Sequence, residues 1–200
     1  MNTQATRDVD DSPQEDLSNV FHDLIEATGE DPGRDGLDET WKRRAPEMWQ
    51  TLTEGYDQAH KPEMTSFPAE GEELVVKTDI PFYSLCEHHL LPFFGRVHIG
   101  YLPDEEIVGL SKLIRYTKWR ARKLLTQERL TRELAEGLSD ELGAEGVIVA
   151  VEAEHLCESM RGVETPETKT TTTVATGRFD PSVSDPTPRR EFFEHVDLSG

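Results

Sequence analysis

Two short segments of the chain combine thiol and imidazole side chains. Cys86 and His89 stand three positions apart in the segment 86–89, and Cys157 follows His155 by two positions. Zinc binds thiolate and imidazole ligands, and a catalytic zinc site has three protein ligands and one open position. Cys86, His89 and Cys157 would form such a Cys₂His site for Zn²⁺ and would use both cysteines of the chain. The alternative is that the cysteines are small buried hydrophobic residues.

Each segment also contains a histidine that this metal site would leave free. These are His88, next to a proposed ligand, and His155, two positions before another. Imidazole is the side chain best suited to proton transfer near neutral pH, and a zinc-activated water needs such partners. Both histidines are therefore candidates for proton transfer. The alternative for His88 is an exposed residue or a support for the metal ligands.

A basic segment stands out because the 200 residues contain 40 acidic and 21 basic side chains, a formal net charge of −19. Its six cations fall within twelve positions: Lys112, Arg115, Lys118, Arg120, Arg122 and Lys123. Lys112, Arg115 and Arg122 share one face of the expected helix. Ser111 stands at its start, where backbone N–H groups suit phosphate, and Arg161 adds a cation beyond Cys157. The pattern favours a phosphate-rich ligand over a plain solvated face.

The composition also excludes several functions. A strongly acidic chain does not fit a general nucleic-acid binder or a protein that docks on anionic lipid. No apolar run approaches the length of a membrane span, and the acidic first fifteen residues do not resemble a secretory signal. We therefore expect a cytoplasmic protein, in which a structural disulfide is disfavoured.

Three regions are expected to position these residues. Residues 1–15 predict a disordered acidic tail, 16–60 an N-terminal helical region, and 61–200 the catalytic domain. In the helical region we expect helices over 17–25 and 37–52, the second interrupted or kinked by Pro46.

The catalytic domain is expected to be α+β. Apolar patterning predicts extended segments at 74–78 and 81–85, strands at 93–102, 147–151 and 169–176, and helices at 111–125, 127–142 and 189–195. The core order is strand, strand, helix, helix, strand, strand. It predicts an antiparallel sheet with a helix pair on one face, with the segment 86–92 as a loop. The residues alone therefore indicate a zinc hydrolase that acts on a phosphorylated small molecule.

Four segments in order resemble the GTP cyclohydrolase I family: 86–93, 109–113, 126–131 and 154–163. The resemblance runs from about residue 37 to the C-terminus. It implies a tunnelling fold, in which subunit sheets join into a β-barrel and two pentameric rings stack into a homodecamer. It also implies that the sites lie between subunits and that Cys86, His89 and Cys157 bind zinc.

The same resemblance assigns roles to the remaining residues. Glu128 would anchor guanine, with Gln127 beside it among the catalytic residues. The triphosphate of GTP would contact Lys112, Arg115 and Arg161, and Arg43 of a neighbouring subunit. The family has a lysine about one turn after Arg43, where this chain has Pro46 and Glu47.

The implied reaction is hydrolytic opening of the guanine ring of GTP. An activated water attacks carbon 8, His155 protonates the adjacent ring nitrogen, and formate leaves. His88 then assists opening of the ribose, and Ser111 helps the sugar rearrangement that leads to 7,8-dihydroneopterin triphosphate. Two alternatives stay open at this point. They are another tunnelling-fold enzyme of pterin or deazapurine metabolism, and a non-catalytic zinc-binding interaction module.

Overall fold

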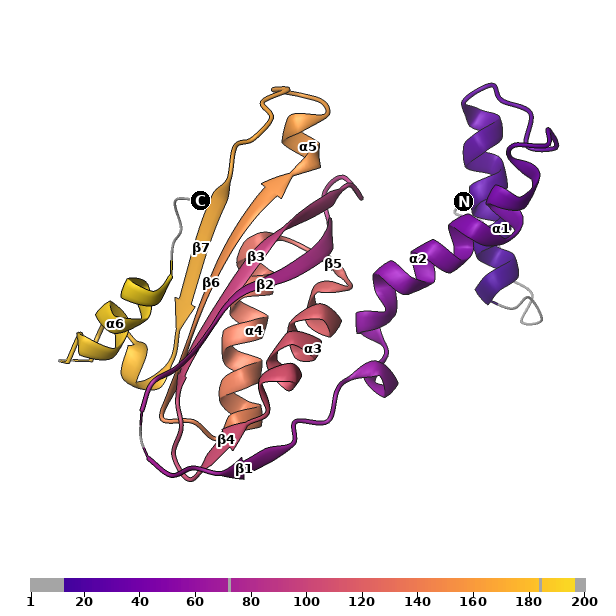
Figure 1. Cartoon of the computed structure of the whole chain (residues 1–200). Coiled ribbons are helices and arrows are strands. Elements are labelled where there is room, and N and C mark those ends of the chain that lie inside the picture. Colours follow the sequence, from indigo (N-terminus) through magenta and orange to yellow (C-terminus); the bar gives the residue numbers. More distant parts are fainter. Residues whose placement is uncertain (1–12, 72, 184, 197–200) are drawn as a thin grey trace, which may run out of the picture. The chain divides into compact units, whose positions relative to one another are not determined.

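A computed structural model describes residues 13–71, 73–183 and 185–196 (Figure 1). The chain divides into two compact units, one that ends at Leu52 and one that begins at Thr53. Of the predicted acidic tail, residues 1–12 lie outside the described residues, whereas residues 13–15 already belong to the first helix. None of the helices in the described ranges combines the length and apolar composition that a membrane span requires.

The first unit contains α1 (Pro13–Ala27), a π-helical turn η1 (Thr40–Arg44) and most of α2 (Ala45–Thr53). The interruption predicted at Pro46 is present. Proline has no N–H to donate to the carbonyl four residues back, and the wider turn, in which the Ala45 N–H donates to the Thr40 carbonyl, lies directly before it. Within this unit the His22 and Trp41 rings meet edge to face at 4.8 Å.

The second unit is built on a five-stranded sheet in the order β5-β2-β3-β6-β7. Its strands are β2 (Val75–Cys86), β3 (Pro92–Leu102), β5 (Leu124–Leu125), β6 (Gly146–His155) and β7 (Thr170–Ala175). All neighbouring strands are antiparallel except β5, which runs parallel to β2. A separate pair joins β1 (Ser66–Pro68) to β4 (Glu106–Val108).

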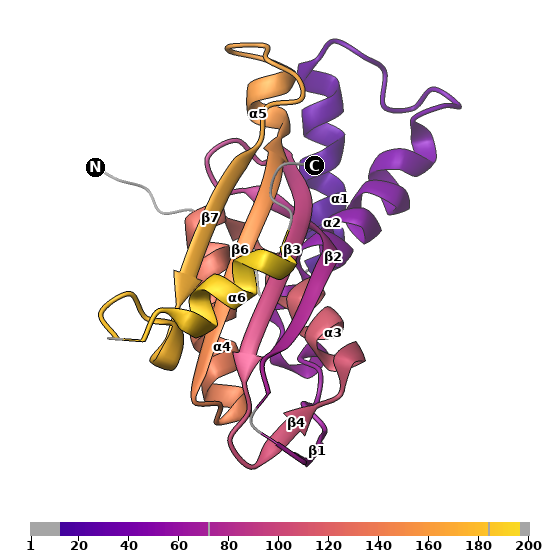
Figure 2. The ribbon, with the colours of Figure 1, turned by 60° about the vertical axis from the view of Figure 1, so that its left-hand side comes forward.

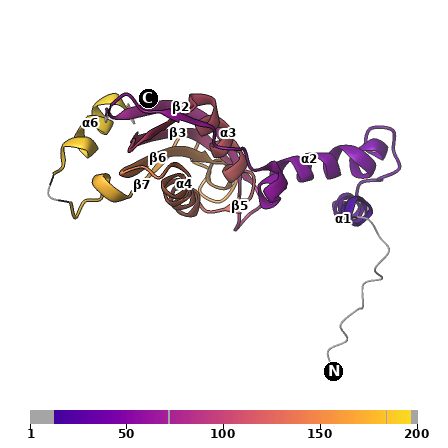
Figure 3. The same ribbon diagram turned by 90° about the horizontal axis from the view of Figure 1, so that it is seen from below.

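Helices cover both faces of this sheet (Figures 2 and 3). The described helices of the unit are α3 (Leu110–Ala121), α4 (Gln127–Leu142), α5 (Leu156–Ser159) and α6 (Thr187–His195), with 3₁₀ turns η2 (Glu54–Tyr56), η3 (Gln58–His60) and η4 (Gly177–Phe179). The larger core joins α3 and α4 to one face, and a smaller core joins α6 to the other. The predicted α+β class, with a helix pair on one face of the sheet, is confirmed.

The alternation along β3 follows from this double cover. Val97, Ile99 and Tyr101 are buried in the larger core, as their spacing predicts. On the opposite face His98 is also buried, and a Cβ added at Gly100 would meet the Phe192 ring of α6 at 2.6 Å. At Gly100, the face of β3 that carries the polar residues of the alternation is therefore covered by the C-terminal helix α6.

Several predicted boundaries were wrong. The strand predicted over 147–151 is β6, which continues to His155. The extended segments 74–78 and 81–85 form one strand, β2, with a bulge between Lys77 and Ile80 where Asp79 adopts a φ of 58°. The helix predicted over 111–125 ends at Ala121. The next residues turn back, so that Leu124 and Leu125 pair with Leu85 and Cys86 as β5. This short pairing places the start of α4 beside the end of β2.

Candidate metal centre and active site

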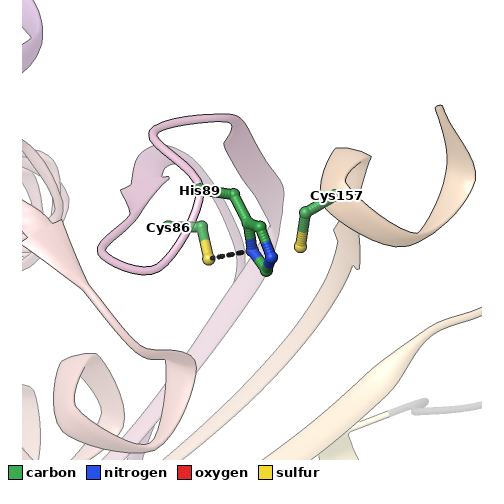
Figure 4. A group of neighbouring side chains, drawn as sticks. All are labelled: Cys86, His89 and Cys157. Carbon is green, nitrogen blue, oxygen red and sulfur yellow. Dashed lines mark hydrogen bonds between the residues drawn. The ribbon is translucent and has the colours of Figure 1, made fainter. Parts of the chain in front are cut away.

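The three predicted metal ligands converge at one end of the sheet (Figure 4). Cys86 is the last residue of β2, His89 lies in the turn that follows, and Cys157 is in α5, just beyond β6. One ligand atom from each lies within 4.8 Å of the other two. The Cys86 Sγ and His89 Nδ1 atoms are 3.6 Å apart. Residues 71 positions apart in the chain are thus brought to one point by the pairing of β3 with β6.

The turn after Cys86 is held by backbone hydrogen bonds. The Cys86 carbonyl accepts from the N–H groups of His89 and Leu90, and the Cys86 N–H donates to the Leu91 carbonyl. Leu90 takes a φ of 56°, a left-handed conformation that is costly for a residue with a Cβ. This strained turn places the imidazole of His89 beside the sulfur of Cys86.

The donor set fits zinc. Two thiols and an imidazole are the ligands that zinc prefers, and three protein ligands leave one position open. Both cysteines are free thiols. Burial raises the pKa of the Cys157 thiol, and the adjacent Cys86 raises it further. A bound cation reverses this preference, since a coordinating thiol is deprotonated.

A cavity of about 490 Å³ opens beside the cluster. Eight of the predicted site residues line it: Cys86, His88, His89, Gln127, Glu128, His155, Cys157 and Arg161. They come from the turn after β2, the start of α4, the end of β6, and α5 with the loop that follows it. The cavity therefore joins the proposed metal ligands to both spare histidines, the carboxylates of Glu128 and Glu158, and one guanidinium group.

His155, the last residue of β6, is held on two sides. Its ring stacks on Phe93 with centroids 4.9 Å apart and planes 3° apart, and its Nε2 atom lies 2.8 Å from the Gln127 Oε1 atom. Burial lowers the pKa of His155, and Glu158 and Glu128 oppose this effect. His88, in contrast, is exposed on the turn, with Nε2 3.9 Å from the Glu87 carboxylate.

Glu128 lies in the first turn of α4. The Thr126 side chain caps this helix by accepting a hydrogen bond from the Arg129 N–H, and Gly143 ends it with a φ of 56°. The cap fixes where the helix begins and so which residues of its first turn border the cavity. Glu128 is exposed, and within the described ranges no ion pair or hydrogen bond occupies its carboxylate.

Ser111, Lys112 and Arg115 do not line this cavity. They lie in the first half of α3, which follows β4, and the Val108 N–H of β4 donates to the Tyr101 hydroxyl. Tyr101 is eight residues along β3 from Phe93, which is roughly 26 Å at the rise of a strand. In a single chain these three residues therefore stand near the opposite end of the sheet from the metal cluster.

The predicted phosphate contacts differ in their present partners. Lys112, Arg115 and Arg161 make no ion pair with another described residue, although acidic side chains are abundant. Arg43 belongs to the first unit and pairs there with Glu39 and Glu47 at 3.4 and 3.2 Å. The first three cations are thus free to meet an anionic ligand, whereas Arg43 would have to exchange partners.

Several residues around the site carry no signal in the sequence. Phe93 stacks on His155, and Thr170 and Thr172 of β7 contact the Gln127 amide. Arg129 links α4 to the metal-binding turn, because its guanidinium lies 3.8 Å from the Glu87 carboxylate. Phe93 and Arg129 do lie inside the segments that resemble the family, but their residue types alone do not indicate these contacts.

Comparisons with known proteins bear on the family to which the chain belongs. The family model for GTP cyclohydrolase I matches residues 17–197. GTP cyclohydrolase 1 of Streptococcus suis is 44% identical over 187 residues, covering 92% of this chain and 98% of the relative. GTP cyclohydrolase 1 of Gloeobacter violaceus is 44% identical over 182 residues, covering 90% and 83%. A solved apo structure of the archaeosine synthase QueF-Like aligns with a TM-score of 0.44 and 14% identity over 54% of this chain and 97% of that one, too weak a likeness to bear on function. The chain belongs to the GTP cyclohydrolase I family.

Proposed function

We propose that the chain catalyses zinc-dependent hydrolytic opening of the guanine ring of GTP, giving formate and 7,8-dihydroneopterin triphosphate. The observation that carries the proposal is the cavity itself. It places a Cys₂His ligand set beside Glu128, His155 and Arg161, which are the groups needed for a purine base, a proton and a phosphate. Release of formate from GTP by the purified protein, with formation of a fluorescent pterin after oxidation, tests it directly.

Cys86, His89 and Cys157 would hold the metal. The chemistry that zinc supplies in a site with three protein ligands is an activated water, the nucleophile that a hydrolysis needs. Around it, this chain supplies the binding groups. Glu128 accepts hydrogen bonds from the N–H edge of guanine, and His155 stands at the cavity wall, where it can deliver a proton to the ring nitrogen next to carbon 8. His88, on the exposed turn, serves the later opening of the ribose.

A single chain does not bring enough of the predicted phosphate-binding residues together to bind the triphosphate of GTP. Arg161 lies at the cavity, but Lys112, Arg115 and Ser111 stand at the other end of the sheet. We propose that a second copy supplies them, as in a homodecamer of two pentamers whose sheets join into a barrel and whose sites lie between subunits. Arg43 of a neighbouring copy would add a further contact.

Arg161→Ala is expected to lower kcat/KM for GTP by about tenfold to a hundredfold, because a charge-assisted hydrogen bond contributes roughly 1.5–3 kcal/mol. The effect should shrink for GMP and vanish for guanosine, and the thermal midpoint should not change. Arg132→Ala is the matched control, because Arg132 is exposed on α4 and lies outside the cavity. An equal loss for GTP and guanosine would show that Arg161 does not bind phosphate.

A mixing experiment tests the shared site. Lys112→Ala and Arg161→Ala, each expressed alone, should keep about a tenth or less of the parent's kcat/KM for GTP. When the two variants are co-expressed, random assembly should restore about a quarter of the sites, because a site needs one intact residue from each of two copies. No recovery in purified mixed oligomers would place both residues in one chain's site.

A further inference from the structure

The Gln127 side chain is buried in hydrogen bonds to the protein. Its exposed fraction is 1%, and its Nε2 atom lies 3.0 Å from the Val151 carbonyl and 2.8 Å from the Thr170 carbonyl. Carbonyl oxygens only accept, so both amide hydrogens are directed at β6 and β7. The Oε1 atom must then be the one that faces His155 Nε2 at 2.8 Å.

The hydroxyls of Thr131 and Thr172 lie beside this amide, and the donor in each of their hydrogen bonds can be assigned. The Thr131 hydroxyl lies 2.8 Å from the Gln127 backbone carbonyl, which can only accept, so Thr131 is the donor there. Each hydroxyl has one hydrogen. In the 2.6 Å contact between Thr131 and Thr172 the donor must therefore be Thr172. The remaining lone pairs of Thr172 face the Gln127 amide nitrogen at 3.2 Å, where they share one of the two amide hydrogens with a carbonyl.

We propose that Gln127, with the hydroxyls of Thr172 and Thr131, holds His155 with its hydrogen on Nε2 and leaves Nδ1 as the ring nitrogen available to a ligand in the cavity. An acceptor at Nε2 requires an N–H there, and a neutral imidazole carries only one. Nδ1 therefore carries a lone pair in the resting protein and must accept a proton before His155 can deliver one to a ligand. Gln127 is thereby a positioning residue that acts through His155. Its N–H groups have no hydrogen left for substrate, in contrast to the catalytic role expected from the sequence.

Phe93 and Gln127 have separate tasks in this arrangement. Stacking on Phe93 fixes the plane of the imidazole, but a ring rotated by 180° about the Cβ–Cγ bond would stack equally well. Such a rotation would take Nε2 away from Gln127 and place a carbon there. The single hydrogen bond from Nε2 to Oε1 therefore selects one of two otherwise similar orientations. The inference rests on the proposed function only for the statement that His155 serves the reaction.

The direct test is the protonation pattern of the resting, zinc-loaded protein. Solid-state NMR of full-length protein labelled with ¹⁵N-histidine distinguishes the two tautomers, and a His155→Gln sample assigns the signal. We expect a single His155 tautomer with hydrogen on Nε2, and a mixture of tautomers in Gln127→Leu. Hydrogen on Nδ1 in the parent would overturn the proposal. This readout needs no turnover, so it stays separate from formate release, which tests the proposed function.

Activity of hydroxyl variants gives the second test. Thr172→Val removes the hydroxyl at nearly constant shape and should lower kcat about tenfold, the scale of one lost hydrogen bond, with KM for GTP and zinc content within twofold of the parent. Thr172→Ser keeps the hydroxyl and should recover kcat. Thr171→Val, at the exposed neighbouring position of β7, is the control for strand disruption. Equal kcat in Thr172→Val and Thr172→Ser would show that the hydroxyl does not position His155.

Discussion

Replacing Cys157 with serine is expected to remove bound zinc and GTP turnover together. The serine oxygen is a far poorer zinc ligand than a thiolate, and only two protein ligands, Cys86 and His89, would remain. We expect zinc content to fall from about one per chain to below a tenth, and turnover to fall by more than about a hundredfold. Elemental analysis of gel-filtered protein and formate release from GTP measure the two quantities on one sample.

The control for this substitution lies directly after the same short helix. Met160 follows α5 and is exposed, so Met160→Ser should leave zinc content and turnover unchanged. Full zinc content in Cys157→Ser would mean that the metal has other ligands. Loss of zinc with full turnover would mean that the metal has no part in the reaction.

The metal cluster could be predicted because its residue types are rare and seldom occur together by chance. Two cysteines, each with a histidine within three positions, leave few combinations for a three-ligand site. The structure joins them through a strand that the sequence indicates only in part, since the strand predicted over 147–151 continues as β6 to His155 and pairs with β3. The strained conformation of Leu90, in contrast, has no sequence signature, because a leucine there carries no turn preference.

Long helices and strands were predicted, whereas short pieces were missed. The apolar stripe of α4 extends over more than ten residues and the alternation of β3 over the six residues 96–101, so chance agreement is small. The strands β1, β4 and β5 have two or three residues each, and pairing with distant partners defines them. The error at the end of α3 arose in this way, because Leu124 and Leu125 fit a helical pattern but pair with β2.

The place of the basic segment in the fold could not be predicted from the sequence. Lys112 follows His89 by 23 positions, and this separation along the chain does not fix their distance in space. Most of the connection is β3, an extended strand of eleven residues that runs away from the metal cluster. A strand separates its ends by the largest distance that its length allows. The sequence therefore identified the cations, but neither the ion pairs of Arg120, Arg122 and Lys123 nor the end of the sheet at which Lys112 and Arg115 lie.

Replacing Glu128 with alanine is expected to abolish selection of guanine while the zinc site stays intact. Its carboxylate can accept two hydrogen bonds from the ring N–H and the exocyclic amine of guanine, each worth roughly 1.5–3 kcal/mol. Glu128→Ala should therefore lower kcat/KM for GTP by about a thousandfold. Zinc content should not change, because Glu128 is not part of the ligand cluster.

The substrate analogue ITP separates recognition of guanine from a general loss of activity. ITP lacks the exocyclic amine, so the parent should prefer GTP over ITP by about tenfold to a hundredfold, and the ratio should approach one in Glu128→Ala. Glu136→Ala, at an exposed position two turns along the same helix, should keep the parent's ratio. If Glu128→Ala lost activity but kept that preference, another residue would have to accept the hydrogen bond from the amine. In that case the Glu128 carboxylate would help to form the cavity but would not recognise the base.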